Sequence, residues 1–199
     1  MKRMPRVSLR RSPSRTAAFA VGVALVVAGC SRTPPSNPSG AAPLDDGQIA
    51  EIVDAIDTQQ IETAHLGLEH GSDPEARAFA QDLLGDQRAA RKELLARVAV
   101  DRVGLQPSIL LELFESRERA ARAWLSNLTG QTFDQDFVAN EIKEQTRQLD
   151  WLDHMLIPGA RDADLRAELQ RQRAVAAGRL ATAQRLASRF PRSASDPLP

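Results

Sequence analysis

The chain has 199 residues, of which 42% are hydrophobic and 26% are charged, as in ordinary soluble globular proteins. Aromatic residues make up only 4% and tyrosine is absent, which argues against an all-β fold, because strands draw on aromatic and β-branched side chains. One cysteine and three histidines exclude an internal disulfide framework, a multi-thiolate metal centre and a histidine-rich metal store. The formal net charge is zero, but residues 1–29 hold six basic residues and no acidic one, which leaves 20 basic against 26 acidic residues in the remainder. That remainder has no general attraction for nucleic acid, so we expect no nucleic-acid partner.

The first 30 residues have the pattern of a bacterial lipoprotein signal peptide. Residues 1–15 are basic, residues 16–27 are apolar, and Val27-Ala28-Gly29 precedes Cys30. A helix that spans a bilayer needs about 20 apolar residues, so this shorter segment is typical of a secretory signal. The small residues before Cys30 resemble a lipobox, at which residues 1–29 are removed and lipid is attached to the cysteine. The alternative is an ordinary buried or free cysteine.

The flanking segments predict a tethered domain in the bacterial cell envelope. Ser31, rather than aspartate, favours the outer membrane by resemblance to Gram-negative lipoproteins, with the protein facing the periplasm. Residues 31–43 are rich in Pro, Ser and Gly and cannot bury enough apolar surface to fold. We therefore predict a signal peptide over residues 1–29, a lipidated cysteine and flexible tether over 30–44, a folded domain over 45–190 and a flexible tail over 191–199.

Two helices are predicted in the first half of the folded domain. The first opens at Asp45-Asp46, carries apolar residues at three- and four-residue steps, and ends at Gly71. The second starts at Ser72-Asp73-Pro74-Glu75, where Ser72 and Glu75 have the spacing of a capping box and Pro74 lies in the first turn. Gly104 and Pro107 close this pair of helices.

Three further helices are predicted in the second half. A shorter one covers residues 108–128 and ends at Gly130, a long one runs from about Thr132-Phe133-Asp134 to Pro158-Gly159, and the last runs from about Asp162 to Phe190. Tight turns make the first two and the last two long helices antiparallel neighbours. The link of about 30 residues between these pairs holds the shorter helix, which predicts an all-α, ferritin-like four-helix bundle with an extra helix in its crossover. An elongated coiled coil is the alternative, and the tight turns and the Ala-rich last helix argue against it.

Three stretches carry a family resemblance: SDPEARAFAQDLLGDQRAARKEL, TGQTFDQDFVANEIKEQ and LRAELQRQRAVAAGRLATAQRL. They look like the domain-of-unknown-function family 4142, whose members are exported bacterial proteins. The resemblance covers about residues 46–188 and implies a ferritin-like bundle in the envelope. It implies no activity.

The resemblance also implies a metal-like pattern from which this chain departs. The family pattern has an inward Glu on the first long helix and an inward His on each of the other three. This chain has Gln60, Gln87, Gln145 and Arg179 at those places. Amide and guanidinium groups do not replace imidazole at a transition-metal site. We therefore expect no cofactor other than the lipid on Cys30.

Glu62 and His65 form the weak alternative for a metal site. Their Glu-x-x-His spacing is half of a ferritin-type di-iron signature, and the second half is absent from the sequence. His65 lies opposite the apolar stripe of its helix, so a solvated histidine is the simpler interpretation. The other acidic residues are interpreted as solvated charges on exposed helix faces.

The stripe geometry predicts a polar cluster inside the bundle instead. Gln60, Gln87 and Gln145 lie one helical turn beyond apolar core positions, and Arg179 lies at the edge of its stripe. We predict that these four meet at mid-bundle, with Asp86 or Glu141 as the anion that pairs with Arg179. The alternative is that the guanidinium extends to water and the amides lie at the rim.

Two functional classes follow from this sequence. The first is a non-enzymatic envelope lipoprotein that contacts the membrane through its lipid, with a structural role or an unidentified envelope protein as partner. The second is a metal- or redox-linked ferritin-like protein. We find no Gly-x-Ser-x-Gly elbow and no Gly-rich phosphate loop, so the sequence offers no catalytic residue.

Overall fold

The computed structural model describes residues 44–101 and 108–190. Within these ranges the chain forms helices and turns and no strand. The elements are α1 (Asp46–His70), α2 (Pro74–Asp101), α3 (Ile109–Leu125), α4 (Gly130–Trp151), the π-helix η1 (Leu152–Leu156), α5 (Ile157–Gly159) and α6 (Ala163–Ala187).

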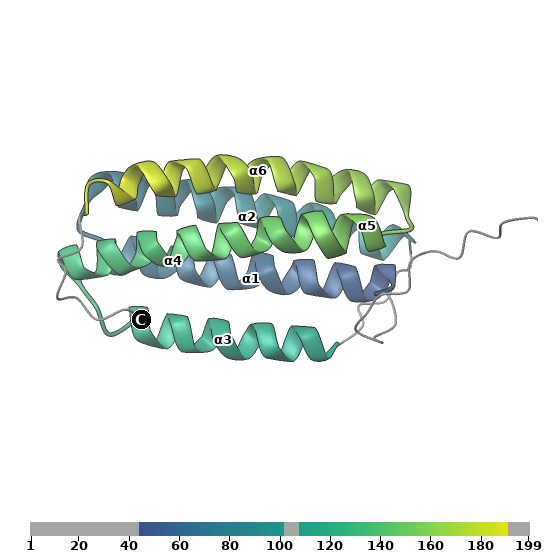
Figure 1. Ribbon diagram of the computed structural model, residues 1–199, viewed down its shortest axis with the longest axis horizontal. Coiled ribbons are helices and arrows are strands. Elements are labelled where there is room, and N and C mark those ends of the chain that lie inside the picture. The colour runs from purple at the N-terminus through teal and green to yellow at the C-terminus, as the bar shows by residue number, and fades with distance from the viewer. Residues whose placement is uncertain (1–43, 102–107, 191–199) are drawn as a thin grey trace, which may run out of the picture. The chain divides into compact units, whose positions relative to one another are not determined.

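Four of these helices form a bundle, and the fifth lies along its side. Helices α1 and α2 pack as an antiparallel hairpin, and α4 packs in the same way on α6. Helix α3 runs back along the bundle beside α1 and α4, so that α2 and α4 point in the same direction (Figure 1). Two hairpins joined by one long crossover are the ferritin-like arrangement, and the predicted fold class is confirmed.

Side-chain caps fix where most of the helices begin. Asp45 accepts a hydrogen bond from the Gln48 backbone N–H at 2.8 Å, and the Gln48 side chain accepts one from the Asp45 N–H at 3.1 Å. This reciprocal pair satisfies two of the N–H groups that a helix start leaves without partners. Ser108 and Asp162 cap α3 and α6 in the same position, each through one side-chain oxygen.

The start of α2 differs from the sequence prediction. Asp73, and not Ser72, caps this helix, because Asp73 Oδ1 accepts from the N–H groups of Glu75 and Ala76 at 2.9 and 3.0 Å. The Ser72 hydroxyl donates to Asp134 on α4 instead. The Ser72 hydroxyl, which a local capping box would use, is thus bonded to the buried carboxylate of Asp134 on a distant helix.

The start of α4 also differs from the prediction. The preceding helix α3 ends at Leu125, and Gly130 is the first residue of α4 with a φ of 62°. Glycine adopts this left-handed conformation without the steric cost that a side chain brings. Gly130 therefore begins the long helix that was expected to begin near Thr132.

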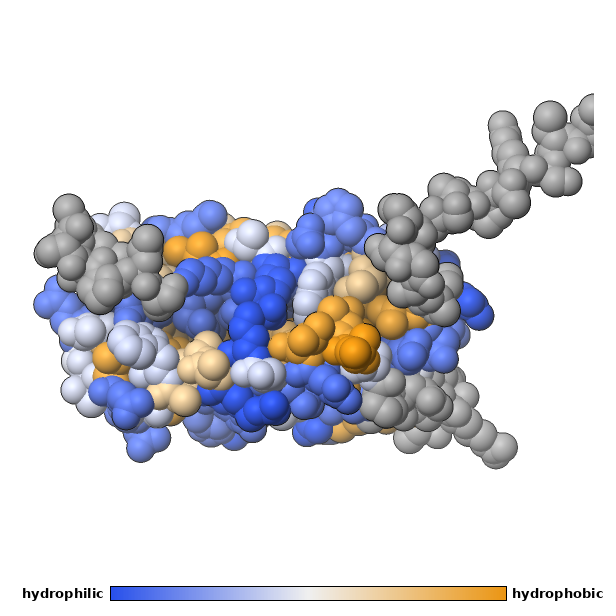
Figure 2. Space-filling model, turned by 60° about the horizontal axis from the view of Figure 1, so that its bottom comes forward, coloured by the Kyte–Doolittle hydropathy of each residue, from blue (hydrophilic) through white to orange (hydrophobic). Residues whose placement is uncertain are grey.

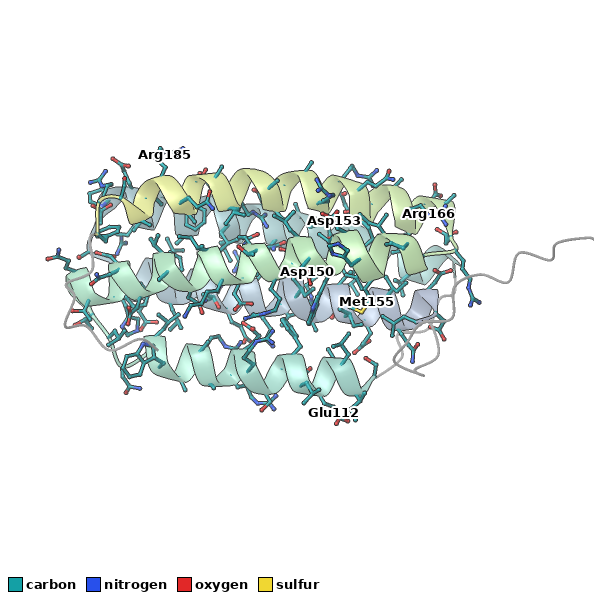
Figure 3. The ribbon with its side chains drawn as sticks, viewed as in Figure 1. Glu112, Asp150, Asp153, Met155, Arg166 and Arg185 are labelled. Carbon is teal, nitrogen blue, oxygen red and sulfur yellow. The ribbon has the colours of Figure 1, made fainter. Side chains whose placement is uncertain are left out.

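The helical stretch that begins with α4 ends as predicted at Pro158-Gly159, but it passes from α4 through the wider π-helix η1 into the short helix α5. In an α-helix the ring of Pro158 would clash with the carbonyl of residue 154. In η1 the N–H of Ile157 instead bonds to the carbonyl of Leu152. Asp153 of this segment points toward α6 (Figure 3), where Arg173 donates to it through two nitrogens, Nη2 at 2.8 Å.

The apolar core is divided between the two ends of the bundle. One cluster joins the first half of α1 to η1 and the start of α6, and includes Ile49, Ile52, Leu94, Phe114, Leu152 and Leu169. The other joins the start of α2 to the start of α4 and the end of α6, and includes Phe79, Phe133, Phe137, Ala183 and Leu186. Buried polar side chains occupy the stretch of the four helices that lies between these clusters.

Candidate functional site

Each of the four bundle helices contributes a polar side chain to the middle of the bundle. The exposed fractions are 6% for Gln60 on α1, 2% for Gln87 on α2, 0% for Gln145 on α4 and 9% for Arg179 on α6. Each residue follows an apolar position by about one helical turn, which is why the fold turns it inward. The sequence prediction placed these four side chains at mid-bundle, and the structure buries all of them.

Gln60 lies at the centre of the hydrogen bonds. Its Nε2 donates to Gln148 Oε1 on α4 at 2.9 Å. Its Oε1 accepts from Gln87 Nε2 on α2 and, at 3.3 Å, from Arg179 Nη1 on α6. One carboxamide therefore bonds directly to side chains of the three other bundle helices.

Arg179 pairs with Asp86, which is one of the two anions predicted for it. The distance from Arg179 Nη2 to Asp86 Oδ2 is 3.3 Å, and the Asp86 side chain is 59% exposed. Burial lowers the pKa of the guanidinium, and the charge of Asp86 opposes that shift. The ion pair therefore runs from the interior to the surface, which reduces the cost of burying the cation.

Glu141 and Gln145 form a separate pair on α4. Gln145 Nε2 donates to Glu141 Oε2 at 3.2 Å, and both side chains are almost fully buried. Within the described part of the chain no hydrogen bond connects this pair to Gln60 or Gln87. Burial raises the pKa of Glu141 to about 7, while the Gln145 hydrogen bond acts to lower it. The predicted cluster is thus two neighbouring groups.

The sequence prediction omitted Asp57, a carboxyl group at the same level of the bundle. Its side chain is completely buried, and burial raises its pKa to about 8 although the charge of Arg179 acts in the opposite direction. Asp57 lies four residues after Val53, so the period of the α1 stripe could have identified it. The interpretation of the acidic residues as solvated surface charges is wrong for Asp57.

That interpretation is also wrong for further acids, and other interior amides were missed. Glu168 and Gln172 follow the core residues Leu165 and Leu169 by one turn, and Gln148 follows Gln145 in the same way. The additional buried polar residues are Asp57, Thr63, Glu118, Asp134, Gln148, Glu168 and Gln172. Their helical spacing was readable, but the period alone does not say that a polar side chain stays in the core.

A second acidic group lies between α3 and α4. Glu118 is buried, and Arg147 Nη1 lies 3.4 Å from its Oε1 and 2.6 Å from Glu144 Oε1. Burial, together with the neighbouring Glu144, raises the pKa of Glu118 to about 8. Arg147 of α4 therefore links α3 to the bundle through Glu118, and Glu144 on its own helix is its second partner.

Glu62 and His65 do not converge on a common point. Glu62 pairs with Arg122 of α3 at 2.9 Å, and His65 Nε2 lies 3.0 Å from Arg88 Nη2 of α2. Both side chains are exposed, and each has an arginine beside it. Over residues 44–101 and 108–190, no group of three or more His, Cys, Asp or Glu side chains is arranged to hold a metal ion.

The donors at mid-bundle do not fit the metal pattern that the family resemblance implies. Amide oxygens are weak ligands for transition metals, and the Arg179 guanidinium carries a positive charge into the same space. What the arrangement offers is a set of hydrogen-bond donors and acceptors around the carboxyl groups Asp57 and Glu141. Such a set orders four helices relative to one another and can take up or release protons.

The predicted lipidation site Cys30 lies outside the described residues. In the described ranges, no helix combines the length and the apolar character that crossing a membrane requires.

Comparison with known proteins identifies a family for this chain. The family described as "Domain of unknown function (DUF4142)" matches residues 31–186. No match was found among curated proteins or among solved structures. The family match covers most of the chain, including the polar residues Gln60, Gln87, Gln145 and Arg179 at mid-bundle. The chain therefore belongs to the family of DUF4142 proteins.

Proposed function

We propose that this protein is a lipid-anchored protein of the bacterial envelope whose helical bundle has a non-enzymatic, structural or binding role. The observation that carries the proposal is the run of basic residues, twelve apolar residues and Val27-Ala28-Gly29 before the only cysteine. Lipid on Cys30 would hold the chain at the outer membrane, and the 13 residues from 31 to 43 would separate the bundle from the lipid.

The interior of the bundle supports a role without catalysis. Gln60, Gln87 and Arg179 bond to one another, and Gln145 bonds to Glu141, while Arg179 Nε and Gln145 Oε1 are buried without a partner among the described residues. A catalytic site needs polar groups that are available to a substrate, and most of the polar atoms of these residues bond to the other helices. The network therefore suits a rigid domain that is presented to the periplasm.

The side of the bundle that carries α3 supports a binding role. Figure 2 turns this side forward and shows apolar surface interrupted by strongly hydrophilic side chains. Among the large apolar residues, Ile109 is 79% exposed, Leu113 is 66% exposed and Trp124 is 49% exposed, and all three belong to α3. A contiguous exposed apolar patch is a feature of surfaces that contact other molecules, and Ile109 and Leu113 lie one helical turn apart on α3.

Expression of the full chain in a Gram-negative host, with an alkyne analogue of palmitate in the medium, tests the anchor. We expect the wild-type protein to take up the label, to lose residues 1–29 by mass spectrometry and to fractionate with the outer membrane. The Cys30→Ser variant should lose the label and the membrane association. The Ser31→Asp variant is a matched control, because it should keep the label and move to the inner membrane.

In the labelling experiment, an unlabelled protein with an intact N-terminus would overturn the proposal of a lipid anchor. Metal analysis of the same preparation separates the two functional classes: we expect less than a stoichiometric amount of iron, zinc or manganese. One metal ion per chain that is lost in Glu62→Ala or His65→Ala would favour the metal-linked class instead.

A further inference from the structure

Helix α3 carries apolar side chains on two opposite faces. One face packs on the bundle through Leu111, Phe114 and Leu125, which are buried. Ile109 and Leu113 lie on the other face, where they are 79% and 66% exposed. The buried face holds α3 on the bundle, so the second apolar face contributes nothing to the packing of the single chain.

The exposed face follows the heptad period of a two-stranded coiled coil. Its side chains recur at alternating steps of four and three residues, which is the spacing of the a and d positions. All of these side chains are exposed and uncharged: Ile109, Leu113, Ser116, Ala120 and Ala123. The outer face of a surface helix is ordinarily polar, so this uncharged seam of a and d positions indicates a surface that meets another helix.

The charges of α3 lie beside the seam and not on it. Glu112 and Arg119 follow one edge of the seam, and Arg117 follows the other edge. Glu112 points outward from α3 (Figure 3), and the side chain of Arg117 is 43% exposed. These are the g and e positions of the heptad, which set the orientation and the partner of a coiled coil.

A second copy of α3 complements these charges when the two helices run in the same direction. In a parallel pair each g position meets the e position of the following heptad on the other helix. Glu112 of one copy then meets Arg117 of the other, and two-fold symmetry makes this ion pair twice. Arg119 likewise meets Trp124 of the other copy, whose indole ring attracts a cation.

The same charges disfavour an antiparallel pair. An antiparallel pair that uses the whole seam would place Arg117 against Arg117 of the second copy. It would also place Arg119 against Arg119 of the second copy, and like charges that face each other cost affinity. The charge pattern of α3 therefore selects the parallel arrangement.

The seam begins at the end of the bundle where α1 begins. Leu44, directly before α1, and Leu110 pack against the same core cluster. Two parallel copies therefore present the starts of their α1 helices at the same end. This arrangement suits two chains that are anchored to one membrane through residues that precede α1, and confinement to a membrane raises the effective concentration of the copies.

We propose that the outer face of α3 is a self-association surface through which two copies of this protein pair in parallel on the membrane. The proposal deepens the binding role proposed for α3 and rests on the proposed lipid anchor. Helix α3 is already folded against the bundle, so pairing does not require the helix formation that limits short coiled coils. About two heptads bury less area than the roughly 1,000 Å² of a stable interface in solution, so anchoring is part of the proposal.

Disulfide cross-linking in membranes from cells that express the full chain tests the pairing. Cys30 is the only natural cysteine, and under the proposed anchor its sulfur carries lipid. The Ala123→Cys variant adds a thiol that meets its own copy in a parallel pair, whereas over the whole antiparallel seam it would face Leu113. We expect oxidation to give a dimer of twice the mass of the chain, with the disulfide at residue 123 by mass spectrometry.

The matched control for the thiol is Ala177→Cys, at an exposed position of α6. This variant is anchored and expressed in the same way, and it should stay monomeric after oxidation. Equal cross-linking of the two variants would mean that the copies only collide on the membrane, and it would overturn the pairing.

Substitution in the seam separates specific pairing from crowding. In the Ala123→Cys background, Leu113→Asp should lower the cross-linked fraction by roughly tenfold, because it places a charge at a core position of both helices. Val175→Asp is the control, since Val175 is an apolar residue of α6 that is 43% exposed, and it should leave the fraction unchanged.

Charge reversal tests the parallel register. In the same background, Glu112→Arg or Arg117→Glu alone should lower the cross-linked fraction by roughly three- to tenfold, because each puts like charges at both symmetric contacts. The double variant should recover the wild-type fraction. The two residues lie on opposite edges of the seam, so recovery requires contact between Glu112 of one copy and Arg117 of the other.

The outcomes separate the pairing from the anchor. A membrane-bound Ala123→Cys protein that stays monomeric overturns the pairing and leaves the anchor intact, and a cross-link to a protein of another mass overturns the pairing as well. A protein that cross-links through residue 123 but lacks lipid supports the pairing and overturns the anchor. Arg117 lies 3.5 Å from Glu118, so thermal unfolding checks each variant, and Leu113→Asp decides the question if the reversed charge does not fold.

Discussion

Arg179 brings a guanidinium into the interior and connects it to α1 and α2. Its nitrogens reach Gln60 at 3.3 Å and Asp86 at 3.3 Å, and its side chain is only 9% exposed. Gln60 and Asp86 bond to this residue, whereas Glu141 and Gln145 bond to each other. The guanidinium therefore does not extend into water. Its ion-pair partner Asp86 is the member of the pair that lies at the surface.

The Arg179→Leu substitution measures what this residue contributes. We expect the free energy of unfolding to fall by roughly 2–3 kcal/mol, because Gln60 loses a buried hydrogen-bond donor and Asp86 loses its ion-pair partner. The loss should be smaller than for a fully buried ion pair, because Asp86 is well exposed. Urea unfolding at pH 7 gives the value.

Arg185 provides the control on the same helix. It points outward from α6 (Figure 3), and Arg185→Leu should change the free energy of unfolding by no more than about 0.5 kcal/mol. Equal effects of the two substitutions would mean that Arg179 makes no special interior contribution.

Asp134 shows how one side chain sets a turn that is distant in sequence. It is 1% exposed, and it accepts from the backbone N–H groups of Ser72 and Asp73 at 3.0 and 2.8 Å. We expect Asp134→Ala to lower the free energy of unfolding by about 2–3 kcal/mol, because two N–H groups lose a charged acceptor. Asp134→Asn keeps one acceptor oxygen, so it should lose clearly less in the same urea titration.

At the scale of helices, α1 packs closely against its neighbours at Gly67. A Cβ atom at this position would lie 2.6 Å from Ala80 Cβ on α2 and 2.9 Å from Phe137 Cζ on α4. These atoms belong to a packed core, so they cannot move aside without cost. Alanine is compatible with the helical backbone of α1 at this position, but its methyl group would clash with α2 and α4.

Two glycine substitutions separate packing from helix propensity. We expect Gly67→Ala to destabilise the protein by about 1–3 kcal/mol through overpacking. Gly85→Ala on α2, where a Cβ atom would meet nothing within 4 Å, should instead stabilise it by about 0.5–1 kcal/mol. Thermal unfolding of the two variants gives shifts of opposite sign, and a stabilising Gly67→Ala would contradict the close approach.

At the scale of the whole molecule, three buried acids make stability depend on pH. The pKa values of Asp57 and Glu118 are raised to about 8 and that of Glu141 to about 7, so these groups keep their protons in the folded state. The unfolded chain loses the same protons near pH 4. The folded state therefore binds more protons between about pH 4 and pH 8, and stability falls as the pH rises through that window.

Urea unfolding midpoints at pH 5 and pH 8.5 test this dependence. We expect the lower midpoint at pH 8.5, and a smaller difference between the two pH values in Asp57→Asn and in Glu141→Gln. Glu112→Gln is the control, since it alters a carboxyl on the outer surface of α3 (Figure 3) and should leave the difference unchanged. A midpoint that rises with pH would contradict the buried, protonated acids.

The sequence by itself determined the helices, their order and the bundle. Apolar residues at helical spacing, the short turns at residues 71–73 and 160–162 and the long crossover leave few other ways to bury those stripes. The spacing also placed Gln60, Gln87, Gln145 and Arg179 toward the interior, because direction around a helix follows from residue number alone.

The tertiary structure decided which polar groups meet and in which charge state. Asp134 takes Ser72 away from its local cap, Asp57 joins the centre from a position that looked like surface charge, and Glu141 bonds to Gln145 rather than Arg179. These pairings depend on the rotation and axial position of helices that are far apart in the chain. Local sequence fixes neither quantity, and the pKa of a carboxyl group depends on both, because they set its burial and its partners.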